Sequence, residues 1–340
     1  MEAIDAIIKQ IDDIVWGIPL IVILLACGIM LTVRLRFLQI RKLGKGFRYM
    51  LHDDDSGHGD VSSFAALCTA LSATVGTGNI VGVATAVSTG GAGALFWMEV
   101  AALFGMATKY AEGLLAIKYR TKDQNGNILG GPFYYIEKGL GRGWKWLAVL
   151  FAIFTAIAAF GIGNTVQANA IATVASESYG ISPYISGAFI CVMTAAVVLG
   201  GVKSIARVCS MLVPLMAAFY VLGCLYILCV NAAYLWPALC LIVKAAFSPE
   251  AAGGGFIGST VMMAARFGIA RGLFSNESGM GSAPIVAAAA QTRNPVRQAL
   301  VSSSGTFWDT VVICALTGLV IVSSVLAYPD IDFSNGATLT

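Results

Sequence analysis

Charged residues are scarce in this sequence. Asp, Glu, Lys and Arg make up 11% of the 340 residues, whereas apolar side chains make up 58%. Charged residues are roughly 25% of an average soluble domain. A water-soluble fold with so little charge would expose large apolar patches, which soluble proteins avoid. The composition therefore excludes a soluble enzyme and a disordered chain, and it predicts an integral membrane protein built from helices.

Residue types that carry metal and redox chemistry are also sparse. His52 and His58 are the two histidines, and the eight cysteines lie in apolar runs without CxxC spacing. Free cysteines in such runs usually pack as small hydrophobic residues. The net charge of +3 is too small to indicate a nucleic-acid partner. The apolar segments contain no nucleophile–base pair, so we predict neither an enzyme nor a resident cofactor.

Eight apolar segments are long enough to cross about 30 Å of hydrocarbon. They are Trp16–Val33, Ser62–Thr89, Leu95–Ile117, Trp146–Ala170, Tyr184–Gly200, Ile205–Val230, Phe256–Ala290 and Leu300–Ala327. Sixteen of the 21 Lys and Arg residues fall on one side of these segments. Loops rich in Lys and Arg stay in the cytoplasm. We therefore predict a multi-pass protein of the cell membrane with an extracellular N-terminus.

Two of the segments, Ser62–Thr89 and Phe256–Ala290, are longer than a membrane span needs. Each has a polar, glycine-containing patch near its middle, at residues 72–79 and 274–282. Glycine costs about 1 kcal/mol in a helix interior, and freed backbone groups at membrane depth must be buried in protein or line a wet cavity. Both segments are therefore predicted to be broken helices. Their opposite directions across the membrane are typical of an inverted-repeat transporter.

This pattern predicts four parts. Residues 1–61 form an extra N-terminal helix and a basic cytoplasmic loop, and residues 62–230 form a first five-helix repeat. Residues 231–255 form an extracellular connection, and residues 256–340 begin a second, inverted repeat. Since two repeats of five need ten helices after the first helix and only seven follow it, we expect a bundle truncated after the eighth helix.

Backbone groups freed at the breaks provide a candidate binding site. The amides of Thr77 and Gly78 suit a carboxylate, aided by the helix dipole. The carbonyls of Ser72 and Val75, with the Asn79 side-chain oxygen, suit a hard cation. Carbonyls near Phe274 and the Asn276 side chain suit an ammonium group. Tight helix packing is the alternative reason for such glycines; two polar breaks in corresponding places favour a site.

Other polar residues in the apolar segments leave more than one interpretation open. Asn164 and Gln167 suit either interhelical hydrogen bonds or a binding site. Lys109 and Glu112 lie three residues apart on one helix, so an ion pair between them is the favoured interpretation. Glu277 suits an ion pair, a gate or a proton-transfer group.

Several motifs resemble those of the alanine or glycine:cation symporter family. They are Thr77–Thr85 (TGNIVGVAT), Gly90–Met98 (GGAGALFWM), Gly105–Glu112 (GMATKYAE), Gly130–Tyr134 (GGPFY) and Ala270–Gly279 (ARGLFSNESG). The resemblance implies an all-α, LeuT-like inverted-repeat bundle with an extra N-terminal helix. It also implies symport of small amino acids, alanine or glycine, usually with sodium.

The resemblance also implies residue roles. The pattern from Val75 to Asn79 matches the break in the first core helix of LeuT-like transporters, which implies carboxylate binding by the amides of Thr77 and Gly78. It implies sodium contacts from Ser72, Val75 and Asn79. Further substrate-pocket residues are implied at Gln167, Phe274, Asn276 and Gly279, so Asn79 is expected to serve both ligands.

The function predicted from these observations is sodium-coupled import of a small neutral amino acid by alternating access. The alternative is an amino-acid-binding receptor that does not transport, or an inactive fragment of such a transporter. Binding without uptake would distinguish the alternative from the leading prediction.

Overall fold

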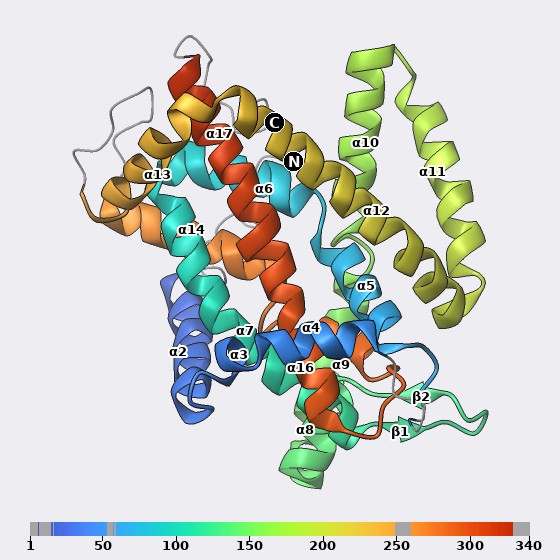
Figure 1. Ribbon diagram of the computed structural model, residues 1–340. Coiled ribbons are helices and arrows are strands. Elements are labelled where there is room, and N and C mark those ends of the chain that lie inside the picture. The colour runs from blue at the N-terminus through green and yellow to red at the C-terminus, as the bar shows by residue number, and fades with distance from the viewer. Residues whose placement is uncertain are drawn as a thin grey trace.

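The computed structural model describes residues 17–52, 57, 59–248 and 260–328, together with positions 6 and 15. The predicted segment starts at Trp16 and Phe256, and the tail beyond Tyr328, lie outside the described residues. The described chain is mostly helical (Figure 1), as its composition predicts.

The first half contains α2 (Ile18–Arg34), α3 (Leu38–Arg41), α4 (Leu43–Leu51), α5 (Ser63–Thr74), α6 (Thr77–Gly90), α7 (Gly93–Tyr119), α8 (Pro132–Leu140) and α9 (Lys145–Ala158). The second half contains α10 (Asn164–Tyr179), α11 (Pro183–Val198), α12 (Gly201–Val230), α13 (Ala232–Phe247), α14 (Val261–Asn276), α15 (Ala283–Ala287), α16 (Pro295–Thr306) and α17 (Ala315–Ala327). A 3₁₀ turn, η1 (Arg142–Trp144), precedes α9, and a π-helix, η2 (Phe307–Cys314), joins α16 to α17.

Three helices among the described residues are long and apolar enough to cross a membrane. They are Gly93–Tyr119, Gly201–Val230 and the continuous run Pro295–Ala327. The α5–α6 pair is a fourth if its two halves count as one span. The other predicted segments are represented by shorter helices, such as α2 with 17 residues and α11 with 16. Membrane-length helices are thus confirmed, whereas the count of eight spans stays a prediction.

Both predicted helix breaks are present. The helices α5 and α6 meet at an angle of 43° across Val75 and Gly76. The second break separates α14 from α15, where Glu277, Gly279 and Gly281 have φ angles of 53°, 89° and 80°. These positive φ values belong to the left-handed region, which glycine adopts without a steric cost.

The structure corrects the prediction in one place and adds two elements to it. The segment Trp146–Ala170 is not one helix, because the turn at residues 159–163 separates α9 from α10, with Gly163 at a φ of 85°. The connection at residues 231–255 contains α13. In a fold that is mostly helical, as predicted, one short strand pair is present: β1 (Thr121–Lys122) pairs antiparallel with β2 (Ile128–Leu129).

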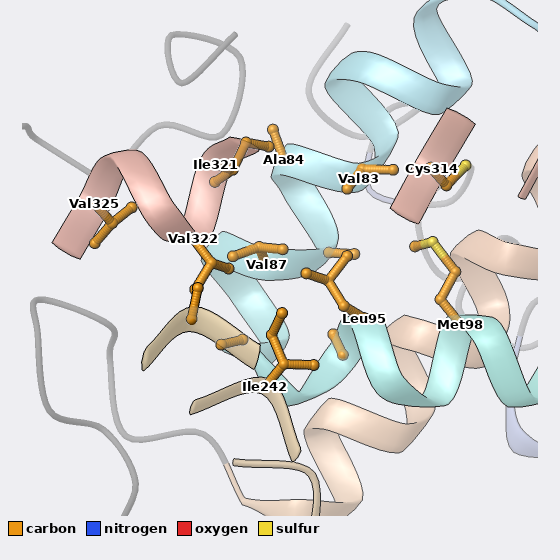
Figure 2. Packing of buried hydrophobic residues seen from close by; sticks show 14 residues of the cluster. Val83, Ala84, Val87, Leu95, Met98, Ile242, Cys314, Ile321, Val322 and Val325 are labelled. Carbon is orange, nitrogen blue, oxygen red and sulfur yellow. The ribbon is translucent and has the colours of Figure 1, made fainter. Parts of the chain in front are cut away.

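The helix α7 is the centre of the packing and contacts α2, α13, α14 and α16. The main apolar cluster joins α6, α7, α13 and the η2–α17 run, as Figure 2 shows for Val83, Leu95, Ile242 and Val322. In Figure 1, α10 and α11 form an antiparallel pair to one side of this core. The helix α6 packs into this cluster, and α14 contacts both α6 and α7; α6 and α14 each border a break.

Candidate functional site

A cavity of about 340 Å³ lies where three interrupted helices meet. Its walls come from both sides of the first break, from the α9–α10 turn with α10, and from the second break. The lining residues are Ala73, Thr74, Thr77, Gly78, Ile157, Ala158, Gly161, Ile162, Gly163, Val166, Gln167, Phe274, Ser275, Glu277 and Met280. The volume falls within the range of about 300–1,000 Å³ typical of small-molecule sites.

Four of the predicted substrate-binding residues line this one cavity: Thr77, Gly78, Gln167 and Phe274. They come from three segments that are far apart in the sequence, α6, α10 and α14. The structure therefore brings residues from both breaks to one cavity, and their role in substrate binding stays a prediction. The α9–α10 turn, which forms the third wall, was not predicted. Its Gly161 and Gly163 lie in an otherwise apolar run, which is the same sequence pattern that predicted the other two breaks.

The first turn of α6 borders this cavity through Thr77 and Gly78. The helix starts at Thr77, and the described residues provide no protein acceptor for the amides of Thr77 and Gly78. An exposed helix N-terminus attracts anions because its amides and its dipole both favour negative charge. This end of α6 is therefore suited to a carboxylate.

Gln167 approaches the same turn from α10. A Cβ placed on Gly76 would lie 2.4 Å from Nε2 of Gln167 and 3.1 Å from its Oε1. Only glycine at position 76 therefore allows the Gln167 amide group to rest in this position. Asn164, by contrast, bonds to its own chain neighbours: its Oδ1 accepts a hydrogen bond from the Thr165 amide at 2.7 Å, and its Nδ2 donates to the Phe160 carbonyl at 3.2 Å.

The end of α5 frees carbonyl groups. Its last backbone bond runs from the Val75 amide to the Leu71 carbonyl, at 2.7 Å. The next amide, of Gly76, donates to Oδ1 of Asn79 at 2.8 Å, so the carbonyl of Ser72 does not receive this i+4 donor. The Ser72 hydroxyl donates to the Thr69 carbonyl, and neither Ser72 nor Val75 is among the residues that line the cavity.

The side chain of Asn79 is fully buried and turns away from the cavity. Its oxygen, predicted to bind a cation, accepts the Gly76 amide, which leaves one further lone pair. Its Nδ2 donates to Oδ1 of Asp309 at 2.8 Å. Asp309 was missed in the sequence, although an acidic residue in the apolar run 307–314 is a signal of function in a membrane segment.

Asn276 and Gly279 do not line the cavity, in contrast to the prediction. Nδ2 of Asn276 donates to the Thr310 hydroxyl at 3.1 Å, and the residue is 1% exposed. A Cβ on Gly279 would lie 2.8 Å from Leu24 on α2. Asn276 thus contacts η2, and Gly279 lies close to α2.

The ionisable residues also have other partners than predicted. Lys109 and Glu112, both described, form no ion pair with each other. Oε1 of Glu112 instead accepts the amide of Gly281 at 3.1 Å, within the second break. Glu277 accepts a hydrogen bond from the Ser282 hydroxyl and lines the cavity.

The sequence as a whole decides the family. Residues 1–340 match the model of the sodium:alanine symporter family. The chain belongs to this family. It is 51% identical over 98% of its length to the sodium/alanine symporter AgcS of Methanococcus maripaludis, of which it covers 74%. It is also 54% identical over 94% of its length to an uncharacterized transporter of Haemophilus influenzae, of which it covers 70%.

A third family member, a putative sodium/proton-dependent alanine carrier protein YrbD of Bacillus subtilis, is 43% identical over 93% of this chain. The chain covers 63% of that relative. Membership confirms the resemblance seen in the motifs, and it confirms that the protein is a sodium-coupled membrane transporter and not an enzyme.

Proposed function

We propose that this symporter imports alanine or glycine together with sodium by alternating access. The observation that carries the proposal is the cavity itself, since Thr77, Gly78, Gln167 and Phe274 reach it from three separate segments. Its location between two broken helices is the location expected for substrate in transporters of this architecture. The names of the relatives in Methanococcus maripaludis and Bacillus subtilis support alanine as the substrate.

In this proposal the amino acid binds by both of its charged groups. The carboxylate accepts hydrogen bonds from the free amides of Thr77 and Gly78 at the start of α6. The ammonium group faces the last turn of α14, near Phe274, and Gln167 closes the third side. Asn276 and Gly279 support this last turn from behind.

The sodium ion binds the carbonyl oxygens of Ser72 and Val75 at the end of α5. Asn79 contributes through its side-chain oxygen, either directly or by holding the Gly76 amide in place. One sodium entering down a potential of 100 mV releases about 2.3 kcal/mol. That free energy is sufficient to accumulate a neutral substrate against its gradient.

We also propose that α5–α6 and α14–α15 are corresponding broken helices of two inverted repeats, with residues 62–230 as the first repeat and the N-terminus outside the cell. The basic residues support this orientation. An N-terminal epitope tag should therefore be reached by antibody on intact spheroplasts; reaching it only after lysis would contradict the orientation.

The transport proposal is tested by uptake into proteoliposomes that contain the full chain. We expect alanine and glycine to accumulate when a sodium gradient is imposed and not when potassium replaces sodium. Asn79→Ala should weaken the dependence on sodium, whereas Ser303→Ala, in a buried hydroxyl that binds the Met106 carbonyl away from the cavity, should not. Binding of alanine without uptake would instead favour a receptor.

A further inference from the structure

Asp309 lies in the π-helix η2, is 1% exposed, and is surrounded by hydrogen-bond donors. Its Oδ1 accepts a hydrogen bond from Nδ2 of Asn79 at 2.8 Å. Its Oδ2 accepts the hydroxyl of Ser275 at 3.0 Å and that of Thr310 at 2.9 Å. Three donors from α6, α14 and η2 therefore converge on one carboxylate.

A carboxylate only accepts hydrogen bonds, so it determines the direction of each of these contacts. The NH₂ group of Asn79 must face Asp309, where it also reaches the Asp309 carbonyl at 3.1 Å. The Asn79 oxygen must then face the other way, and there it accepts the Gly76 amide at 2.8 Å. Asp309 thus determines which end of the Asn79 side chain meets the first break.

The anchored residues hold opposite walls of the cavity. Asn79 belongs to the first turn of α6, directly after Gly78, and Ser275 lies in the last turn of α14. A Cβ on Gly78 would lie 3.9 Å from both Cα and Oγ of Ser275, so the two walls are close to contact. Thr310 extends the link, because its hydroxyl accepts Nδ2 of Asn276.

The π-helical geometry brings these groups together. The wide turn of η2 includes both Asp309 and Cys314, and both reach Nδ2 of Asn79, the sulfur at 3.2 Å. Isolated π-helical turns inside α-helices occur frequently at functional sites. Asp309 itself is not among the residues that line the cavity.

We infer that Asp309 is a positioning residue for the substrate site: it orients the Asn79 amide and holds the start of α6 against the end of α14. It acts through Asn79 and Ser275 without touching the amino acid. This inference rests on the proposed function of the cavity as the amino-acid site.

Asp309→Asn tests the inference with almost no change in volume. The new NH₂ group would face either the Asn79 NH₂ group or the two hydroxyls, whose protons would then lose their acceptor. Unsatisfied buried donors are costly. We therefore expect the KM for alanine and the KM for sodium each to rise about tenfold, with kcat changed less than twofold.

The exchange variant Asn79→Asp/Asp309→Asn provides the rescue. The carboxylate introduced at position 79 would accept a hydrogen bond from the Gly76 amide with one oxygen. Its other oxygen would accept a hydrogen bond from the NH₂ group introduced at position 309. The amide oxygen introduced in η2 would accept the two hydroxyls. We expect the KM for alanine to return to within threefold of the wild type; the KM for sodium is not the readout of rescue, because Asn79 is itself a proposed sodium contact. Ser303→Ala, in a buried hydroxyl outside the cluster, serves as the matched control and should leave both unchanged.

The possible outcomes distinguish the positioning role of Asp309 from the proposed function of the cavity. Wild-type KM values in folded Asp309→Asn, or no rescue of the KM for alanine by the exchange, would overturn the positioning role while leaving the proposed function intact. If wild-type protein shows no sodium-driven uptake, the proposed function fails and the inference fails with it. If Asp309→Asn does not fold, Thr310→Val removes one donor to the carboxylate. It should raise the KM for alanine about threefold, and an unchanged KM would overturn the inference.

Discussion

Replacing Gly76 by alanine should damage substrate binding while sparing the fold. The added Cβ would lie 2.4 Å from Nε2 of Gln167, closer than any packed methyl group. The obstacle is the far end of a flexible side chain, so Gln167 moves and the backbone does not. Gly76 has an extended φ of 176°, which alanine also adopts.

The size of the effect follows from the hydrogen bond that Gln167 would lose to the bound amino acid. A hydrogen bond to a charged group contributes about 1.5–3 kcal/mol, which corresponds to a roughly 10- to 150-fold weaker affinity. The free energy of unfolding should change by less than about 1 kcal/mol, because no backbone contact is broken.

Alanine substitutions at two further glycines serve as controls for Gly76→Ala. A Cβ on Gly82, also in α6, meets nothing closer than the Thr77 carbonyl oxygen at 4.0 Å. Gly82→Ala should therefore keep wild-type affinity and gain up to about 1 kcal/mol of helix stability. A Cβ on Gly268 would lie 2.1 Å from the Ala94 carbonyl oxygen, where α14 crosses α7, so Gly268→Ala should unfold the protein.

The assay is alanine binding by purified variants, with melting temperature measured on the same samples. A double-mutant cycle isolates the cause. In a Gln167→Ala background the clash is removed, so adding Gly76→Ala should weaken binding no further. If Gly76→Ala weakens binding equally in both backgrounds, the reasoning from Gln167 is refuted.

Three other predictions follow from single contacts. Glu112→Ala should leave the buried amide of Gly281 without an acceptor and lower the free energy of unfolding by about 1–3 kcal/mol, measured by thermal melting. Arg120 donates to three carbonyls within residues 288–292, at 2.6–2.8 Å, so Arg120→Gln should speed hydrogen exchange in this segment while leaving exchange in α7 unchanged. Gly78→Val should fold, since its Cβ meets only ordinary contacts, yet lose alanine binding because its methyl groups fill the cavity; retained binding would contradict the site.

Much of the architecture follows from local sequence. Low charge and long apolar runs predict membrane helices, because backbone groups in lipid must pair within their own segment. Glycine and small polar residues in an otherwise apolar run predict the breaks at Gly76 and after Asn276, since both positions weaken a helix wherever it is placed. The same rule would have found the turn at Gly161 and Gly163, had a third break been considered.

Sequence by itself indicated the membrane class, the two main breaks and the free amides of Thr77 and Gly78, because each depends on groups within a few positions of one another. Gln167 and Phe274 were indicated by the resemblance of the motifs to a known family. Only the tertiary structure decided which way the side chains near the breaks point. It places Asn276 against η2 and Gly279 close to α2, outside the lining of the cavity, and it brings Asp309 to Asn79 across 230 residues of sequence. A hydrogen bond between distant segments depends on how whole helices pack, and no local pattern of residues encodes that packing.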